Sequence, residues 1–266
     1  MTISGNQFSN CCNFVNMKDN FSTRAAIYAK HRPTYPSSLF DYITKFVQHR
    51  KLVWDCGTGN GQSATELSKY FEKVFATDIS SKQIEYAKKK NNITYALEPA
   101  EKTNLADNSV DLVTISQALH WFKFDEFYAE VKRVSTATGI IAAWTYSLLQ
   151  VNEITDALIH KYYFETLGEY WDEERKYVNN GYHTIPFPFK QISSPGFHIE
   201  VNWGLEELEG YFNTWSALQK FITANKYNPV PELMEKIKLN WPVSEVKKII
   251  FPIHLKLGHV HLRSTQ

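Results

Sequence analysis

The chain has 266 residues and a formal net charge of +1, so it is long enough for one elaborated domain or for a core with a cap. Its balanced charge includes no basic stripe that could neutralise a phosphate backbone, which excludes nucleic acid as an expected partner. Three cysteines are too few for a disulfide framework and no apolar run has the length of a membrane span, so a cytoplasmic protein with no membrane partner is expected.

Residues 1–20 are rich in Asn and Ser, show no periodicity and predict a flexible N-terminus. A helical pattern follows over residues 21–30 and is ended by Pro33 and Pro36. A second helix is predicted next from a one-sided apolar face, which is formed by Leu39, Tyr42, Ile43, Phe46 and Val47. Residues 21–50 are therefore expected to form an N-terminal helical cover.

Strands and helices alternate from residue 51 to residue 146. The predicted strands cover residues 52–56, 74–78, 93–97, 110–116 and 139–146. The predicted helices cover residues 61–71, a segment capped by Ser80 or Ser81 with Ile84 and Ala87 turned inward, and residues 124–134. This alternation predicts an α/β fold with a parallel sheet that helices cover on both faces.

The pattern changes after residue 150. Long helices are predicted over 154–167 and 205–221, and strands over 198–203 and 247–261, the last interrupted by Pro252. The simplest organisation is a single domain over residues 21–266. In it, residues 51–146 form a ligand-binding core, and residues 147–266 supply further helices and the closing strands.

One stretch narrows the function more than any other, namely the run VWDCGTGNG from Val53 to Gly61. A buried strand that ends in an acidic, glycine-rich turn lets a nucleoside ligand contact bare backbone. Three further polar stretches follow the later strands, and they are Asp78, Ala100-Glu101 and Ser116-Gln117. Because the carboxyl ends of parallel strands meet at one edge of the sheet, the four stretches together predict a site for an adenosine-type ligand.

The glycine spacing argues against a dinucleotide. The dinucleotide fingerprint requires glycine at the sixth position counted from Gly57, where this chain has Gln62, and no P-loop motif is present. Asp55 would repel a pyrophosphate but suits a ligand that carries an ammonium and a sulfonium, as S-adenosylmethionine does. Asp78 is spaced from the turn so that its carboxylate could accept hydrogen bonds from two ribose hydroxyls.

On these motifs the chain resembles the class I S-adenosylmethionine-dependent methyltransferases. The resemblance rests on residues 53–61, on Asp78 within residues 76–80, and on residues 100–111, and it spans roughly residues 21–146. It implies a doubly wound, Rossmann-like sheet of seven mostly parallel strands, with an N-terminal helical cover and C-terminal helical insertions. One departure is the turn before the fifth strand, where the family often has Pro-Gly-Gly and this chain has Ala137-Thr138-Gly139.

A narrower resemblance is to the trans-aconitate methyltransferase-like branch, whose members methylate small molecules, some of them on carboxylates. It rests on Phe21, Tyr28, Arg32-Pro33, Tyr35-Pro36, residues 117–122 and residues 214–218.

The family resemblance implies S-adenosylmethionine as the cofactor, with S-adenosylhomocysteine as its product. The implied cofactor-binding residues are Tyr28, Arg32, Asp55, Gly57, Thr58, Gly59, Asp78, Ile79, Ala100, Glu101 and Gln117. In this arrangement Asp78 holds the ribose, and the glycine turn with Asp55 borders the methionine part. Ala100 and Glu101 lie by the adenine, and Gln117 lies near the methyl donor.

Methyl transfer from a sulfonium is an in-line displacement that depends mainly on positioning, which can supply about 7–11 kcal/mol. A carboxylate acceptor is already ionised at pH 7 and needs orientation, for which Arg32 is the candidate. A phenol acceptor would need a general base, for which His120 is the candidate. His120 could equally pack beside Trp121 and Phe122. The histidines and cysteines show no ligand spacing, so no metal is predicted.

Two other functions stay open, a nicotinamide-dependent oxidoreductase and a non-catalytic S-adenosylmethionine-binding protein of the same fold. Gln62 disfavours the first of them. The expected partner is a small-molecule acceptor with a carboxylate or hydroxyl oxygen. A monomer or homodimer is expected.

Overall fold

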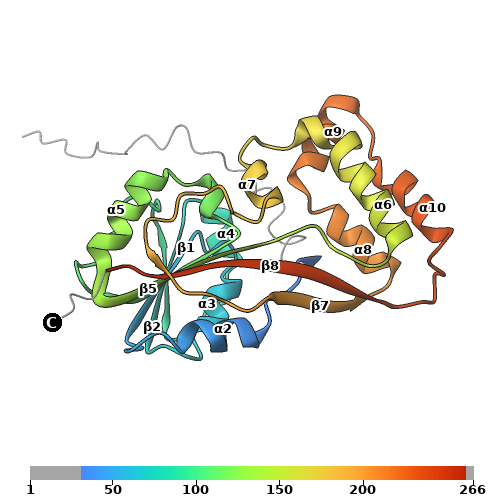
Figure 1. The fold of residues 1–266 in the computed structure, drawn as a ribbon. Coiled ribbons are helices and arrows are strands. Elements are labelled where there is room, and N and C mark those ends of the chain that lie inside the picture. The colour runs from blue at the N-terminus through green and yellow to red at the C-terminus, as the bar shows by residue number, and fades with distance from the viewer. Residues whose placement is uncertain (1–30, 262–266) are drawn as a thin grey trace, which may run out of the picture.

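The computed structural model describes residues 31–261, and Figure 1 shows them as a twisted sheet flanked by helices, with a helical lobe at one end. The predicted N-terminus over 1–20, the predicted helix over 21–30 and Tyr28 lie outside the described residues. The first described helix, α2 (Ser37–Thr44), begins after Pro36 and confirms the predicted second helix.

Five parallel strands form the sheet's centre in the order β3-β2-β1-β4-β5. Their bounds are β1 (Leu52–Cys56), β2 (Lys73–Asp78), β3 (Ile93–Leu97), β4 (Val110–Ser116) and β5 (Ser135–Tyr146). The predicted α/β fold with its mostly parallel sheet is therefore confirmed. The strand order reverses beside β1, and ligands of such sheets bind in the crevice at that switch point.

The antiparallel part of the sheet is larger than predicted. The long strand β8 (Lys247–His259) pairs with β5 along its C-terminal half, from Ile253 to His259. Its other edge pairs with β6 (Lys190–Gln191) and with β7 (Phe197–Trp203). The described part thus contains eight strands and the prediction of seven is wrong, because the two-residue strand β6 also pairs with β8, at Gly258 and His259.

Helices cover both faces of the parallel strands, as predicted. They are α3 (Gln62–Leu67), α4 (Ser81–Glu85) and α5 (Phe124–Val134), together with α2. On one face α2 and α3 bury Leu39 and Leu67 in the same apolar core as Val53. The core of the other face contains Trp54 and Phe127 of α5, whose rings lie 6.0 Å apart. The parallel sheet is therefore rigidly held from both sides, and its carboxyl edge is left for loops.

The chain after β5 forms a helical lobe near the far end of β7 and β8 (Figure 1). Its α-helices are α6 (Glu153–Lys161), α8 (Leu205–Phe212), α9 (Ser216–Asn225) and α10 (Val230–Lys238). One further helix, α7 (Arg175–Asn179), also follows β5. Helix α7 lies between this lobe and the sheet and contacts η2 (Leu119–Trp121), the 3-10 turn after β4. No helix among residues 31–261 combines the length and the apolar character that a bilayer crossing requires.

Two helices of the lobe differ from the prediction. The predicted helix over 205–221 is broken before α9, because the Thr214 hydroxyl donates to the Tyr211 carbonyl at 2.6 Å and Trp215 is extended. The predicted helix over 154–167 becomes the π-helical turn η3 (Tyr162–Thr166) after α6. Helices α7 and α10 and strand β6 have no counterpart among the predicted elements.

Asp111, at the start of β4, is a buried carboxylate that fastens β4 to β1. Its Oδ2 accepts hydrogen bonds from the backbone nitrogens of Lys51 at 2.9 Å and Leu52 at 3.1 Å. Asp111→Ala leaves both amide groups without this acceptor, so it should lower the free energy of unfolding by about 1–3 kcal/mol. Urea denaturation measures the effect, with the exposed Glu72→Ala as the control. Equal losses in the two variants would contradict this role for Asp111.

Candidate functional site

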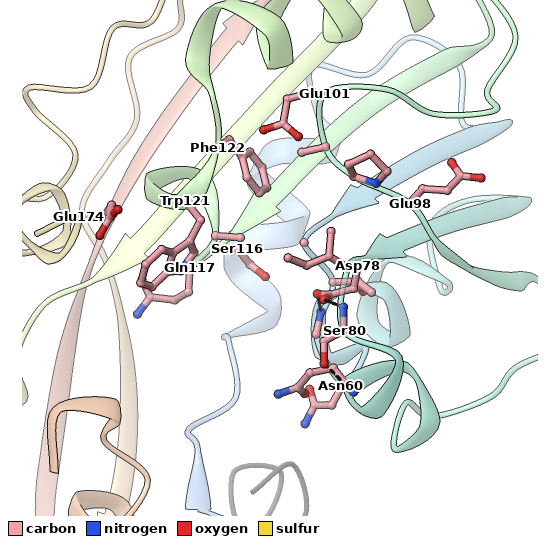
Figure 2. Close-up of a pocket in the computed structure, with 18 of the residues that line it drawn as sticks. Asn60, Asp78, Ser80, Glu98, Glu101, Ser116, Gln117, Trp121, Phe122 and Glu174 are labelled. Atoms are coloured by element: carbon pink, nitrogen blue, oxygen red, sulfur yellow. Dashed lines mark hydrogen bonds between the residues drawn. The ribbon is translucent and has the colours of Figure 1, made fainter. Parts of the chain in front are cut away.

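A cavity of about 530 Å³ opens at the carboxyl ends of the central strands (Figure 2). This volume lies within the range of small-molecule pockets, roughly 300–1,000 Å³. All four stretches that were predicted to meet contribute to its wall, through Gly57, Thr58, Gly59, Asp78, Ile79, Ala100, Glu101, Ser116 and Gln117. The predicted convergence at the sheet edge is therefore confirmed.

The turn after β1 exposes its backbone to the cavity. Gly57, Gly59 and Gly61 all have positive φ angles, of 65°, 55° and 76°, which favour glycine. A Cβ atom on Gly57 would lie 2.6 Å from the Cβ of Ala118, so the loop after β4 packs directly on the turn. A Cβ atom on Gly59 would meet nothing closer than Gln83 Oε1 at 3.9 Å, so the turn borders open space there.

Asp78 joins this turn to the end of β2. Its Oδ2 accepts a hydrogen bond from the Gly59 nitrogen at 2.8 Å, and its Oδ1 accepts one from the Ser80 nitrogen at 2.8 Å. The predicted cap of α4 is also present, because the Ser80 hydroxyl accepts from the Gln83 nitrogen. Two charge-assisted bonds therefore fix the carboxylate on the cavity wall.

The opposite wall comes from the loop after β4 and from α7. Figure 2 shows Gln117, Trp121 and Glu174 across the cavity from Asp78. The Gln117 side chain is held by a hydrogen bond that its amide oxygen accepts from the Thr145 hydroxyl. The Gln117 backbone has a positive φ angle of 54°. These contacts fix the side of the cavity that faces the helical lobe.

The cavity wall is acidic. Its carboxylates are Asp78, Glu98, Glu101, Glu126 and Glu174, whereas Lys123 is the one cationic residue among the described lining. A pyrophosphate would be repelled by this wall, whereas an ammonium or a sulfonium would be attracted. The charge of the wall therefore agrees with the sequence argument against a dinucleotide.

Comparisons with known proteins decide the family. A family model described as "Methyltransferase domain" matches residues 54–143. A Dictyostelium discoideum protein named "Putative methyltransferase" is 34% identical over 248 residues, which cover 90% of this chain and 94% of that protein. This chain belongs to the class I S-adenosylmethionine-dependent methyltransferases.

Two further similarities agree with this family. A solved structure described as a "Putative Type II Methyltransferase" from Anaeromyxobacter dehalogenans has a TM-score of 0.81 and 35% identity. The match covers 86% of this chain and 98% of the chain in that structure. A Saccharomyces cerevisiae protein named "Probable S-adenosylmethionine-dependent methyltransferase CRG1" is 29% identical over 62% of this chain and 59% of that protein. Membership in this family leaves a nicotinamide-dependent oxidoreductase without support.

S-adenosylmethionine is the cofactor of this methyltransferase, and the cavity wall fits its chemistry. The bare backbone at Gly59 leaves room for a ligand, and Asp78 offers carboxylate oxygens to hydroxyl groups. The acidic wall suits the positive charges of the cofactor. Among residues 31–261, no group of three or more His, Cys, Asp and Glu side chains could hold a metal ion.

Asp55 does not line the cavity but lies fully buried beneath the glycine turn. Its two carboxyl oxygens accept hydrogen bonds from the hydroxyls of Thr58 at 2.6 Å and Thr114 at 2.8 Å. Burial raises the pKa of Asp55 from 3.8 to about 6, although these hydrogen bonds oppose the rise. The expectation that Asp55 borders the ligand is therefore corrected, because it supports the turn from below.

His120 lies behind the cavity wall rather than on it. Its ring is buried between Trp121 and Tyr182, and its Nδ1 lies 2.8 Å from the Tyr182 hydroxyl oxygen. Burial, and next the charge of Arg175, lower the pKa of His120 to about 3. The imidazole is therefore neutral at physiological pH.

Arg32 also lies outside the residues that line the cavity. Its Nη1 donates to the Tyr146 hydroxyl at 2.6 Å, and its guanidinium carbon lies 5.3 Å from the centroid of the Tyr211 ring. Tyr35 connects the two places, because it lines the cavity and its ring lies 6.3 Å from that of Tyr146. Tyr28, the other residue expected to close over the site, lies outside the described residues.

Several wall residues were not predicted from the sequence. They are Tyr35, Gln62, Ser80, Gln83, Glu98, Pro99, Ala118, Phe122, Lys123, Glu126 and Glu174. Most of them neighbour a predicted stretch along the chain, so extending each stretch by a few residues would have found them. Glu174 has no such signal, because only the packing of α7 brings it to the cavity.

The raised pKa of Asp55 predicts an unusual dependence of stability on pH. Between about pH 4 and pH 6 the folded protein keeps this proton and the unfolded chain loses it, so stability falls as pH rises through this window. Asp55→Asn removes the titration. The wild type therefore loses stability between about pH 4 and pH 7, and the variant does not lose this contribution. The difference between the two free energies of unfolding, variant minus wild type, should rise by about 2 kcal/mol over this range.

Urea denaturation of the cofactor-free protein across this pH range tests the prediction. The exposed Glu72→Gln serves as the control and should run parallel to the wild type. A constant difference between Asp55→Asn and the wild type would show that Asp55 titrates normally.

Proposed function

We propose that this methyltransferase methylates a carboxylate oxygen of a small acidic molecule. The observation that carries the proposal is the place of His120, which is buried behind the cavity wall and does not line the cavity. This burial lowers the pKa of His120 to about 3. A hydroxyl acceptor needs a general base whose pKa is near the working pH. A carboxylate is ionised at pH 7 and needs only to be oriented.

Arg32 is the proposed contact for the reacting carboxylate. A guanidinium can bind a carboxylate through two parallel hydrogen bonds, which fixes the orientation of the acceptor. The contacts of Arg32 with Tyr146 and Tyr211 hold it at the carboxyl end of β5, where the Tyr146 ring lies 6.3 Å from that of Tyr35 on the cavity wall. The narrower resemblance to the trans-aconitate methyltransferase-like branch supports the same acceptor class.

The proposed cofactor contacts follow the four stretches of the wall. Asp78 accepts from the ribose hydroxyls, and the backbone of the glycine turn borders the methionine part. Ala100 and Glu101 lie by the adenine, and Gln117 lies toward the reacting end. When bound, the cofactor supplies an electrophilic methyl group on a sulfonium, so the residues around it need to align the acceptor and exclude water. Trp121 and Phe122 provide an aromatic wall for that purpose.

Asp78→Asn should weaken S-adenosylmethionine binding by about tenfold or more, because charge-assisted bonds to the ribose contribute roughly 1.5–3 kcal/mol each. Isothermal titration measures the dissociation constant. Glu98→Gln is the matched control, because it removes a charge from the same wall. The Glu98 carboxylate accepts a hydrogen bond from the Asn104 side chain at 2.7 Å and is not the proposed ribose contact. Equal effects of the two variants would point to the charge of the wall rather than to a ribose contact.

Transfer of labelled methyl groups to a panel of carboxylic acids and phenols tests the acceptor. We expect transfer to carboxylic acids, with kcat/KM nearly constant from about pH 6 to pH 8.5, because the carboxylate stays ionised over this range. His120→Gln should keep kcat/KM within about tenfold of the wild type. A loss of several decades, or transfer to phenols alone, would contradict a carboxylate acceptor. Cofactor binding without any transfer would indicate a non-catalytic binding protein.

A further inference from the structure

A second arginine, besides Arg32, is held in a defined position. Arg175, in the first turn of α7, donates from Nε to the Tyr163 hydroxyl at 2.6 Å. Its guanidinium carbon lies 4.7 Å from the centroid of the Trp171 ring, which is a favourable cation–π distance. The Tyr163 hydroxyl is itself fixed, because it donates to Asn179 Oδ1 at 2.7 Å. The guanidinium therefore has a fixed place and direction.

The charge of Arg175 has no carboxylate partner within residues 31–261. Its neighbour Asp172 pairs with Lys220 at 2.7 Å, and Glu174 lies on the wall of the cofactor cavity. Arg175 is half-buried and is held by aromatic rings and a phenol, which leave its terminal nitrogens as donors. A guanidinium that is partly desolvated and has no anion among the described residues is suited to bind an anionic ligand.

The charges of Arg175 and Arg32 act on the same two tyrosines, Tyr211 and Tyr163. Both oppose the rise in the pKa of Tyr211 that burial causes, and both do so for Tyr163. Arg175 also acts on His120, directly behind the cavity wall. The ring contacts agree, because Arg175 lies over Tyr163 at 5.6 Å, Arg32 lies over Tyr211 at 5.3 Å, and both of these rings pack against Trp215. The two guanidinium groups therefore border one cluster of aromatic rings.

This region adjoins the cofactor cavity through α7. Glu174 lines the cavity and Arg175 follows it directly in the chain, and α7 contacts η2, which carries Trp121 of the cavity wall. Figure 2 shows Glu174 on the same side of the cavity as Trp121 and Gln117. The nearby π-helical turn η3, a form often found at functional sites, carries Tyr163 toward Arg175.

We propose that Arg175 binds a second, non-reacting anionic group of the acceptor and is the residue that selects dianionic over monoanionic molecules. The inference rests on the proposed function, because it gives Arg32 the reacting carboxylate and Arg175 the other one. Two fixed guanidinium groups on different elements can hold a molecule at two points, which orients it toward the cofactor. A purely structural arginine would contribute to stability but not to the charge preference for the acceptor.

Isothermal titration of the complex with S-adenosylhomocysteine tests the inference, with succinate, glutarate and fumarate as probes. Each dianion is compared with its own monomethyl ester, which has almost the same shape and one charge fewer. We expect the wild type to bind at least one dianion more tightly than its ester by a factor on the order of 10–100. Arg175→Gln should remove that ratio and leave the affinity for S-adenosylhomocysteine unchanged. Arg175→Lys should restore part of the ratio, because it keeps the charge without the planar fork.

Lys176→Gln is the matched control, because it removes a positive charge from the next residue of the same helix. Its side chain is exposed and lies over the Tyr177 ring, so it should leave the ratio unchanged. The inference is overturned if the wild type shows no preference for any dianion, if Arg175→Gln weakens acid and ester equally, or if Lys176→Gln has the same effect as Arg175→Gln. If Arg175→Gln does not fold, Arg175→Lys and Lys176→Gln decide by the same ratio.

Labelled methyl transfer separates this inference from the proposed function. A dianion preference that depends on Arg175, without transfer to any carboxylic acid, would refute the proposed function and leave the anion site. Transfer to carboxylic acids with no role for Arg175 in the preference would refute the inference and leave the proposed function.

Discussion

Asp78 contacts two parts of the chain at once, and the shape of the cofactor cavity depends on that double contact. One carboxyl oxygen accepts from Gly59 in the turn after β1, and the other accepts from Ser80 at the start of α4. Because β1 and β2 are neighbouring parallel strands, this side chain fixes both of their ends relative to one another. Because both bonds are made within the protein, they hold the wall in a fixed shape, and a fixed shape reduces the entropy that binding must overcome.

A second carboxyl group, that of Asp55, lies below the same turn. Asp55 is buried and has a pKa of about 6, and the charge of Asp78 contributes to that rise. Above this pH the turn therefore lies between two negative charges, one buried and one on the cavity wall. The hydroxyls of Thr58 and Thr114 stabilise the buried negative charge, because each donates a hydrogen bond to the Asp55 carboxylate. A cationic cofactor would further offset the charge of the wall.

The sequence predicted the parts of the site whose signal is local and missed those that depend on packing. Gly57 directly follows β1 and Asp78 is the last residue of β2, so placing the strands also placed these residues at the sheet edge. Periodicity favoured Ile84 as an inward residue of α4, but that helix buries Gln83 beside Gly59, where the missing side chain leaves space. Glu174 had no signal at all, because only the contact of α7 with η2 determines its position.

Helix α7 separates two regions of opposite charge. Glu174 belongs to the acidic wall of the cofactor cavity, and Arg175, the next residue, belongs to the region around Tyr163 and Tyr211. Under the proposed function the cofactor is cationic and the acceptor is anionic, so each is attracted to one region and repelled by the other. An acceptor in the acidic cavity would face several carboxylates, and a sulfonium near the arginines would face two guanidinium groups. Under this proposal, electrostatic attraction directs the cationic cofactor to the acidic cavity and the anionic acceptor to the region of the two arginines.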